Sequence, residues 1–182
     1  PGDLFGQPAH YGEQLAVAAK HGLAVLEDAA QAFGGEYRGK KVCGLGCTAG
    51  ATSFFPAKPL GGYGDGGAIC TDDDALAEVL RSIRVHGKGD DKYDNIRIGL
   101  NGRIDTLQAA ILLPKLEILS EEIAARQQVA AWYGEALAAI PGITPPRLSD
   151  GCSSTWAVYF ILGDGGKRAG VVADVKARHI PA

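Results

Sequence analysis

One stretch of the chain limits its possible folds more than any other: Ser53-Phe-Phe-Pro-Ala-Lys58-Pro-Leu-Gly-Gly-Tyr-Gly-Asp-Gly-Gly-Ala68. Two prolines flank Lys58, and five glycines follow before Ala68. Proline removes a backbone donor, and glycine weakens the interior of helices and strands, so neither element can contain this run. The stretch therefore predicts a tight loop between two short strands, at residues 52–55 and 67–71.

This loop presents one amine, that of Lys58, in a stiff setting lined with glycine. Such a loop suits a catalytic nucleophile, because rigid loops hold functional groups in fixed positions. The other interpretation is a solvated lysine in a hairpin loop, which is the commoner role of a lone lysine in a glycine-rich turn.

Composition and charge exclude several classes of partner. The chain has 182 residues, enough for one domain or slightly more, and a formal net charge of −3. This balance gives no electrostatic footprint for nucleic acid or an anionic membrane surface. No apolar run approaches the roughly 20 residues that cross a bilayer. We therefore expect a cytoplasmic protein that binds neither nucleic acid nor membrane.

The four cysteines are Cys43, Cys47, Cys70 and Cys152. Their spacing lacks the second pair or neighbouring histidine that would complete a zinc site, and they are too few for a disulfide scaffold. We expect free thiols and no bound metal.

The first part of the chain indicates an α/β fold. Residues 12–21 are rich in helix formers and end at Gly22, which predicts a helix with a left-handed stop. Residues 23–26 predict a short strand, with Glu27 and Asp28 at its carboxyl end. This pattern predicts a mainly parallel sheet flanked by helices, in which ligands gather beyond the carboxyl ends of the strands. Asp28 is therefore a candidate site residue, with an N-cap for the following turn as its alternative role.

The remaining elements are expected in this order: a hairpin at residues 37–42, a helix capped by Thr71 or Asp72 and ending near Val85, a polar loop at 88–95, a long helix ending near Ile140, a strand at 155–162 and a helix at 169–179. Pro114 should kink or split the long helix. Pro145-Pro146 and residues 149–154 predict a linker. We expect a large domain at residues 1–142 and the start of a small domain at 143–182.

Asp28, Gln31, Ser53 and Lys58 together offer the groups that pyridoxal phosphate requires. An amine must be partly deprotonated to bond to the cofactor aldehyde. A carboxylate keeps the ring nitrogen protonated, a polar group meets the ring hydroxyl, and further donors hold the phosphate. These residue types are common, so their spacing alone does not assign the roles.

Three long motifs resemble successive signatures of one enzyme family. They are Glu27-Asp-Ala-Ala-Gln-Ala-Phe-Gly34, the loop at residues 53–68, and Gly99-Leu-Asn-Gly-Arg-Ile-Asp-Thr-Leu-Gln-Ala-Ala-Ile-Leu112. The resemblance is to the DegT/DnrJ/EryC1/StrS family of sugar-nucleotide aminotransferases, which are pyridoxal-phosphate enzymes of fold type I. It covers about residues 4–162. It implies the central part of an aspartate aminotransferase-like large domain, followed by the start of a small α/β domain.

The resemblance also implies roles for the motif residues in the cofactor site. Lys58 would hold the cofactor covalently, and Asp28 would pair with its ring nitrogen. Gln31 would contact the ring oxygen, and Ser53 would contact the phosphate. Asn101 would reach the phosphate of the cofactor in a neighbouring subunit, so a homodimer would share its active sites.

Three further residues are expected to bind substrate. Arg103 would meet a negatively charged substrate in the dimer, with a salt bridge at the start of the helix as its alternative role. His86 and Tyr63 are candidates for lining the site. His86 has the alternative role of a cation at a helix C-terminus.

The implied reaction is amino transfer from glutamate to a keto-sugar nucleotide, with Lys58 as general base and acid. The motifs, including Arg84-Val-His-Gly-Lys, resemble the branch that aminates the 3-keto group of a UDP-N-acetyl-hexuronic acid for bacterial lipopolysaccharide O-antigen synthesis. The alternatives are a non-catalytic or dimerising remnant of the family, and a pyridoxal-phosphate-dependent sugar dehydratase. Dehydratases of this family carry histidine in place of the lysine, so Lys58 favours transamination.

The chain contains no methionine and opens on Pro1, so we expect an internal piece of a longer polypeptide. The family parts that form a backbone phosphate cradle, stack on the cofactor ring and complete the small domain would then lie outside it. We therefore expect this polypeptide alone to bind cofactor weakly and to transaminate slowly or not at all.

Overall fold

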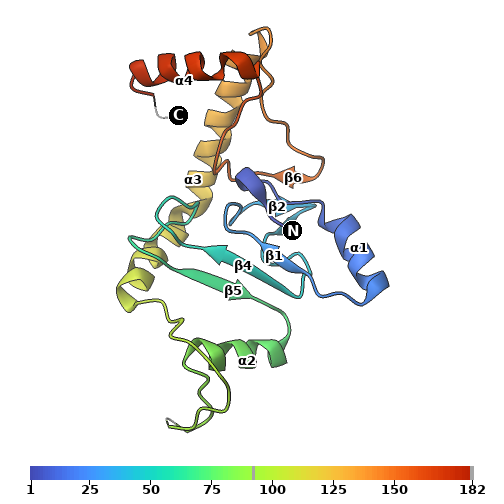
Figure 1. Ribbon diagram of the computed structural model, residues 1–182, viewed down its shortest axis with the longest axis vertical. Coiled ribbons are helices and arrows are strands. Elements are labelled where there is room, and N and C mark those ends of the chain that lie inside the picture. The colour runs from blue at the N-terminus through green and yellow to red at the C-terminus, as the bar shows by residue number, and fades with distance from the viewer. Residues whose placement is uncertain (92, 181–182) are drawn as a thin grey trace.

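A computed structural model describes residues 1–91 and 93–180 of the chain (Figure 1). The elements of these residues are, in order, η1 (Leu4–Gly6), α1 (Tyr11–His21), β1 (Leu26–Asp28), β2 (Glu36–Tyr37), β3 (Lys40–Lys41), β4 (Ala49–Ser53), β5 (Gly67–Cys70), α2 (Asp74–Arg84), α3 (Thr106–Ala138), β6 (Cys152–Ser153), η2 (Gly165–Lys167) and α4 (Arg168–Ala177).

The sheet at the centre of the fold has three strands in the order β1-β4-β5. Strands β1 and β4 are parallel, and β5 is antiparallel to β4. Asp28 at the end of β1 pairs with Ala51, and Ser53 at the end of β4 pairs with Gly67. Adjacent parallel strands run in the same direction, so their carboxyl ends lie along the same side of the sheet. This register therefore places Asp28 and Ser53 together on that side, which is called the edge of the sheet below.

A second sheet has the order β3-β2-β6 and is antiparallel throughout. Strands β2 and β3 form a hairpin, and β6 returns from a distant part of the sequence to pair with β2. Figure 1 shows α3 as a long helix that runs from beside β4 and β5 towards α4. Among the described residues, no helix has the combination of length and apolar character that a bilayer crossing requires.

Two clusters of buried side chains hold these elements together. The first joins α1 to the β2–β3 hairpin through Tyr11 and Tyr37, whose rings meet edge to face with centroids 6.3 Å apart. The second packs Leu60, from the loop after β4, against Leu112 and Leu119 of α3. The second cluster therefore anchors the Lys58 loop on the long helix.

Several sequence predictions are confirmed. The helix expected at residues 12–21 is α1, and Gly22 closes it in the left-handed region with φ +62°. The hairpin at 37–42 corresponds to β2 and β3, and the strand after the glycine loop corresponds to β5. The helix expected at 169–179 is α4.

Other predictions are wrong in position. The strand expected at 23–26 begins instead at Leu26, because the N–H of Leu23 still donates to Ala18 O at 2.9 Å and completes the end of α1. Helix α2 is capped by Asp73, whose Oδ1 accepts the N–H of Leu76 at 3.0 Å, and not by Thr71 or Asp72.

The region after the first sheet differs more strongly. Helix α3 runs unbroken through Pro114, so the predicted split is wrong: a proline removes one hydrogen bond, and 33 residues retain the others. The linker expected at 149–154 contains β6. The strand expected at 155–162 is not formed there, because Trp156 takes the left-handed region with φ +51°.

Of two other predictions, one is tested in part and one is not tested. The polar loop at residues 88–95 is confirmed on the described residues, whereas residue 92 lies outside them. The division into domains after residue 142 stays a prediction.

Candidate cofactor site

Asp28 and Ser53 occupy the ends of neighbouring parallel strands, which is where α/β proteins place their ligands. Asp28 is exposed, and its Oδ1 accepts the N–H of Ala30 at 3.1 Å. This contact is the local capping role that the sequence left open, and it leaves the carboxylate at the surface. Ser53 is half-buried, and its Oγ accepts the N–H of Phe55 at 3.2 Å.

Gln31 lies in the turn that follows β1 and is held from two sides. Its Oε1 accepts the N–H of Phe5 at 2.7 Å, and its backbone O accepts the hydroxyl of Thr155 at 2.8 Å. Thr155 is completely buried, and Phe5 adopts a φ of +60°, which is uncommon for a bulky residue. Such strain is retained where surrounding contacts require it, so the turn that carries Gln31 has one defined position.

Lys58 lies half-buried in the loop between β4 and β5. Its backbone N–H donates to Phe55 O at 2.8 Å, and the next two residues, Pro59 and Leu60, are buried. The loop closes through the N–H of Gly62, which donates to Phe54 O at 2.8 Å. Residues 55–57 before Lys58 are exposed and the two residues after it are buried, so the loop packs on one side of its lysine and the role of Lys58 stays a prediction.

The glycines of this loop are required by close packing. A Cβ on Gly61 would strike the carbonyl oxygen of Pro56, and a Cβ on Gly62 or Gly64 would lie 3.0 Å from the amide group of Gln108. Gln108 Oε1 also accepts the N–H of Tyr63 at 2.8 Å, and Lys115 Nζ donates to Gly61 O. Sequence reasoning did not single out Gln108, although the third motif contains it.

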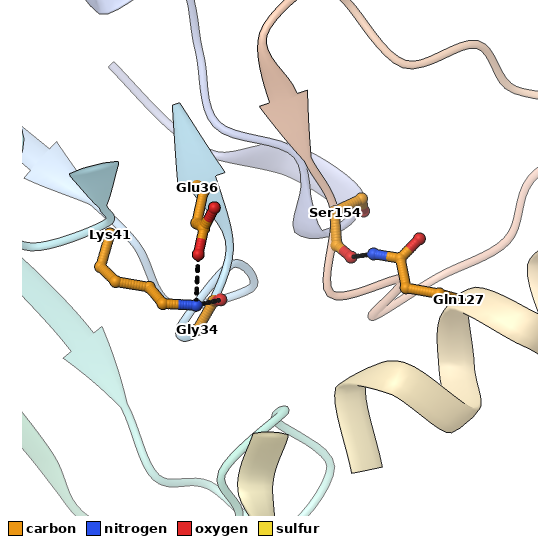
Figure 2. Close-up of polar contacts among 5 residues, drawn as sticks. All are labelled: Gly34, Glu36, Lys41, Gln127 and Ser154. Atoms are coloured by element: carbon orange, nitrogen blue, oxygen red, sulfur yellow. Dashed lines mark hydrogen bonds and ion pairs between the residues drawn. The ribbon is translucent and has the colours of Figure 1, made fainter. Parts of the chain in front are cut away.

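A second anchor joins α3 to the segment that covers Gln31. Figure 2 shows Gln127, on α3, with its Nε2 donating to the backbone O of Ser154. Its Oε1 accepts the indole N–H of Trp156 at 2.8 Å. The two contacts bracket Thr155, so Gln127 fixes the residue that holds Gln31. No motif in the sequence pointed to this role.

The same view shows how the β2–β3 hairpin is tied to the turn after Gln31. Lys41 Nζ lies 2.7 Å from Glu36 Oε1 and donates to Gly34 O at 3.1 Å (Figure 2). An exposed ion pair of this kind adds about 0–1 kcal/mol. The ion pair therefore matters more for the position of the turn than for the free energy of unfolding.

His86, Asn101 and Arg103 form a separate group beyond the end of α2. The N–H of His86 donates to Leu100 O at 3.0 Å, and Arg103 Nε donates to Asn101 Oδ1 at 2.9 Å. Arg103 forms a side-chain hydrogen bond here, and its predicted alternative, a salt bridge, is not found among the described residues. Figure 1 shows the connection from α2 to α3 descending below α2 and then returning to the start of α3.

The structure thus brings some predicted residues together and leaves others apart. Asp28, Gln31, Ser53 and Lys58 surround one edge of the sheet, although no hydrogen bond joins their side chains in the described part of the chain. Tyr63 is 77% exposed beside the same loop. A cavity of about 880 Å³ lies between β4, β5 and α2, and its described lining includes none of these five residues.

Two buried acids lie next to Asp28: Glu27 precedes it in β1, and Asp3 donates its backbone N–H to Asp28 O. Glu27 is 0% exposed and Asp3 is 2% exposed. Burial raises the pKa of Asp3 and raises the pKa of Glu27 to about 7. Tyr11 donates its hydroxyl to Asp3 Oδ1 at 2.7 Å, and burial raises its pKa too. Sequence reasoning noted Glu27 in the first motif but missed Asp3, which has no recognisable pattern around it.

Comparison with known proteins decides the family. The model of the DegT/DnrJ/EryC1/StrS aminotransferase family matches residues 1–182. The chain belongs to the DegT/DnrJ/EryC1/StrS aminotransferase family. The resemblance of the three motifs is thereby confirmed.

Individual members of the family agree in sequence and in fold. The UDP-2-acetamido-2-deoxy-3-oxo-D-glucuronate aminotransferase of Pseudomonas aeruginosa is 51% identical over 181 residues, covering 100% of this chain and 49% of that enzyme. A DegT/DnrJ/EryC1/StrS aminotransferase from Brucella abortus is 48% identical with a TM-score of 0.93, covering 100% of this chain and 47% of that one. DesV of S. venezuelae, in complex with a ketimine intermediate, is 38% identical with a TM-score of 0.94, covering 100% of this chain and 48% of that one.

These matches confirm the predicted α/β fold of the aminotransferase family. The chain spans about half the length of the relatives that it matches. Aminotransferases of this family depend on pyridoxal phosphate.

The residues at the sheet edge fit this cofactor by their chemistry. An amine on a packed loop, an exposed carboxylate, an amide fixed in a turn and a strand-end hydroxyl are the four kinds of group that it needs.

Proposed function

We propose that this protein moves an amino group from glutamate to a keto-sugar nucleotide, using pyridoxal phosphate. The observation that carries the proposal is the register of β1 and β4, which places Asp28 and Ser53 at one edge, beside the loop of Lys58. The finer substrate assignment is the 3-keto group of a UDP-N-acetyl-hexuronic acid. It rests on the 51% identity to the P. aeruginosa enzyme named above.

Each residue at the edge would have a distinct task. Lys58 would attach to the cofactor aldehyde, Asp28 would hold the proton on the ring nitrogen, and Ser53 would donate to the phosphate. Gln31 would contact the ring oxygen, from a turn that its bonds to Phe5 and Thr155 keep in place. When bound, the cofactor supplies an electron sink that makes the carbon–hydrogen bond beside the amine acidic.

Lys58 would also carry the proton of the reaction. Once released from the cofactor, its amine can accept a proton at one carbon and return it at another, as general base and then acid. Pro59 and Leu60 are buried, so the backbone next to Lys58 is packed against the rest of the fold. Positioned proton transfer of this kind contributes about 10²–10⁴-fold to a rate.

We further propose that the active unit is a homodimer with shared sites. Asn101 would reach the cofactor phosphate of the other subunit, and Arg103, His86 and Tyr63 would line the substrate site. Support comes from apolar side chains that are exposed on the same connection and on the start of α3: Ile96, Ile98, Leu100, Leu107 and Leu113. A patch of this kind is typical of a surface that another subunit covers.

The cellular setting is part of the same proposal. Amination of a nucleotide sugar in bacterial lipopolysaccharide O-antigen synthesis would take place in the cytoplasm. The net charge of −3 gives no electrostatic footprint for nucleic acid.

The proposal is tested by following amino transfer from glutamate to a UDP-3-keto-hexuronic acid, with product detected by mass spectrometry. The Lys58→Ala variant should lose about 10²–10⁴-fold in rate. Lys40→Ala, which changes an exposed lysine outside the site, should keep the full rate. In a preparation whose wild-type protein transaminates, equal rates for Lys58→Ala and Lys40→Ala would refute the proposed role of Lys58.

A further inference from the structure

The buried acids Asp3 and Glu27 leave two oxygen atoms without partners. Asp3 Oδ1 accepts the N–H of Ala9 at 3.0 Å and the hydroxyl of Tyr11 at 2.7 Å. Glu27 Oε1 accepts the N–H of Cys43 at 2.9 Å. The other two oxygens, Asp3 Oδ2 and Glu27 Oε2, are buried and have no hydrogen-bond partner among the described residues. A buried polar atom in that state is costly, so it needs an explanation.

The explanation lies in how the two carboxyl groups face each other. Asp3 and Glu27 flank the bridge between Gly2 and Asp28, so both side chains lie on the same buried face of this strand pair. Two ionised carboxylates are both acceptors and cannot bond to each other. One proton between them converts one acid into a donor and satisfies both oxygens. We propose that Asp3 and Glu27 share one proton, and that this acid pair positions Asp28 for the cofactor.

The surroundings favour a single negative charge on the pair. The titratable groups close to it are Tyr11 of α1, Asp28 of β1, Cys43 and Cys47 between β3 and β4, and Cys152 of β6. Burial raises the pKa of the Cys43 thiol to about 12, so it stays neutral. Two buried charges of the same sign would repel strongly at this range, which the shared proton avoids.

The pair is connected to Asp28 through the backbone. The N–H of Asp3 donates to Asp28 O at 2.9 Å, and the N–H of Asp28 donates to Pro1 O at 2.9 Å. Gly2 forms the corresponding parallel bridge with Asp28. The segment at residues 1–3 therefore pairs with β1 at Asp28, the residue that the proposed function assigns to the cofactor. The acid pair stabilises this pairing.

A rise in pH should weaken the pairing of residues 1–3 with β1. When the shared proton leaves, two carboxylates repel at the place where residues 1–3 meet β1. The backbone bonds of Asp28 should then open more often. This inference rests on the proposed function only for the role of Asp28, and the state of the proton can be measured without cofactor.

Infrared spectroscopy of the 182-residue chain in ²H₂O at pH 6 tests the shared proton. We expect the carbonyl band of one buried, protonated carboxyl. Both Glu27→Gln and Asp3→Asn should abolish it, because the new amide donates in place of the proton and the remaining acid ionises. The exposed acid variant Glu78→Gln should leave the band unchanged. A band that survives in one of the two buried variants, or a wild-type spectrum without it, would overturn the shared proton.

Hydrogen exchange tests the positioning role separately. Above pH 7 the amides of Asp3 and Asp28 should exchange faster than the intrinsic pH dependence predicts, and Glu27→Gln should remove this excess. An excess that Glu27→Gln leaves in place would overturn the positioning role. If pyridoxal phosphate then fails to attach to Lys58 while both spectroscopic results hold, the proposed function fails and the acid pair stands.

Discussion

At the scale of single residues, the site depends on backbone groups that approach closely. Gly61 sits where any side chain would meet the carbonyl oxygen of Pro56, and its own carbonyl accepts Lys115 Nζ. Gly170 of α4 is the opposite case, because a Cβ there would meet open space. The same substitution should therefore have opposite effects at the two positions.

We predict that Gly61→Ala lowers the free energy of unfolding by about 1–3 kcal/mol, the usual cost of overpacking. Gly170→Ala should raise it by up to about 1 kcal/mol, because alanine is the better helix former. Urea denaturation followed by circular dichroism measures both. Similar changes at the two sites would show that the Lys58 loop is less tightly packed than its contacts indicate.

Residue types and motifs singled out part of the candidate site, whose roles stay predictions, and they missed other residues for a physical reason. Asp28, Gln31, Ser53 and Lys58 were recognisable because cofactor chemistry needs their functional groups. Asp3 and Gln127 act by holding other residues in place, and their partners are distant in sequence. The contacts of Gln127 with Ser154 and Trp156 form only when the chain after α3 folds back against that helix. The spacing of residues in the sequence does not predict this.

At the scale of elements, helices with clear local signals were predicted well. Helix α1 has helix-forming residues and a glycine stop, and both appear where expected. Strands were predicted less well. Residues 155–162 look extended, but they form single bonds to residues 5 and 6 and an isolated bridge between Leu162 and Thr144 instead of a ladder. Pairing of β6 with β2 likewise brings together segments far apart in sequence, which local propensity cannot predict.

The cap of α2 provides a direct test at this scale. The sequence pointed to Thr71 or Asp72, whereas Asp73 Oδ1 accepts the N–H of Leu76 at 3.0 Å. We predict that Asp73→Ala costs about 1 kcal/mol of stability, as N-cap removal typically does. Asp72→Ala, at the neighbouring exposed position, should change stability by less than about 0.5 kcal/mol. Chemical denaturation of the two variants decides, and a larger effect at Asp72 would restore the sequence assignment.

At the scale of the whole molecule, the acid pair makes stability depend on pH. The pKa of Glu27 is raised from its ordinary value of 4.5 to about 7 in the folded chain. The folded state therefore binds more protons than the unfolded state between these values. Its contribution is fully present below about pH 4.5 and is lost as the pH rises through about 7.

We predict that the free energy of unfolding falls across this range, with a slope of up to about 1.4 kcal/mol per pH unit for one proton. Glu27→Gln should flatten this part of the curve, because its amide does not titrate. Denaturation at a series of pH values provides the measurement. A wild-type curve that rises between pH 5 and 7, or a variant with an unchanged slope, would contradict the assignment.

The central claim is that Lys58 is the residue that bonds to pyridoxal phosphate, and reductive trapping tests it most directly. Borohydride makes even a weak, reversible attachment permanent, and peptide mass spectrometry then locates the added group. We predict one phosphopyridoxyl group per chain, on Lys58, and its loss in Lys58→Ala. A label spread over exposed lysines such as Lys20 and Lys40, and unchanged in Lys58→Ala, would contradict the account.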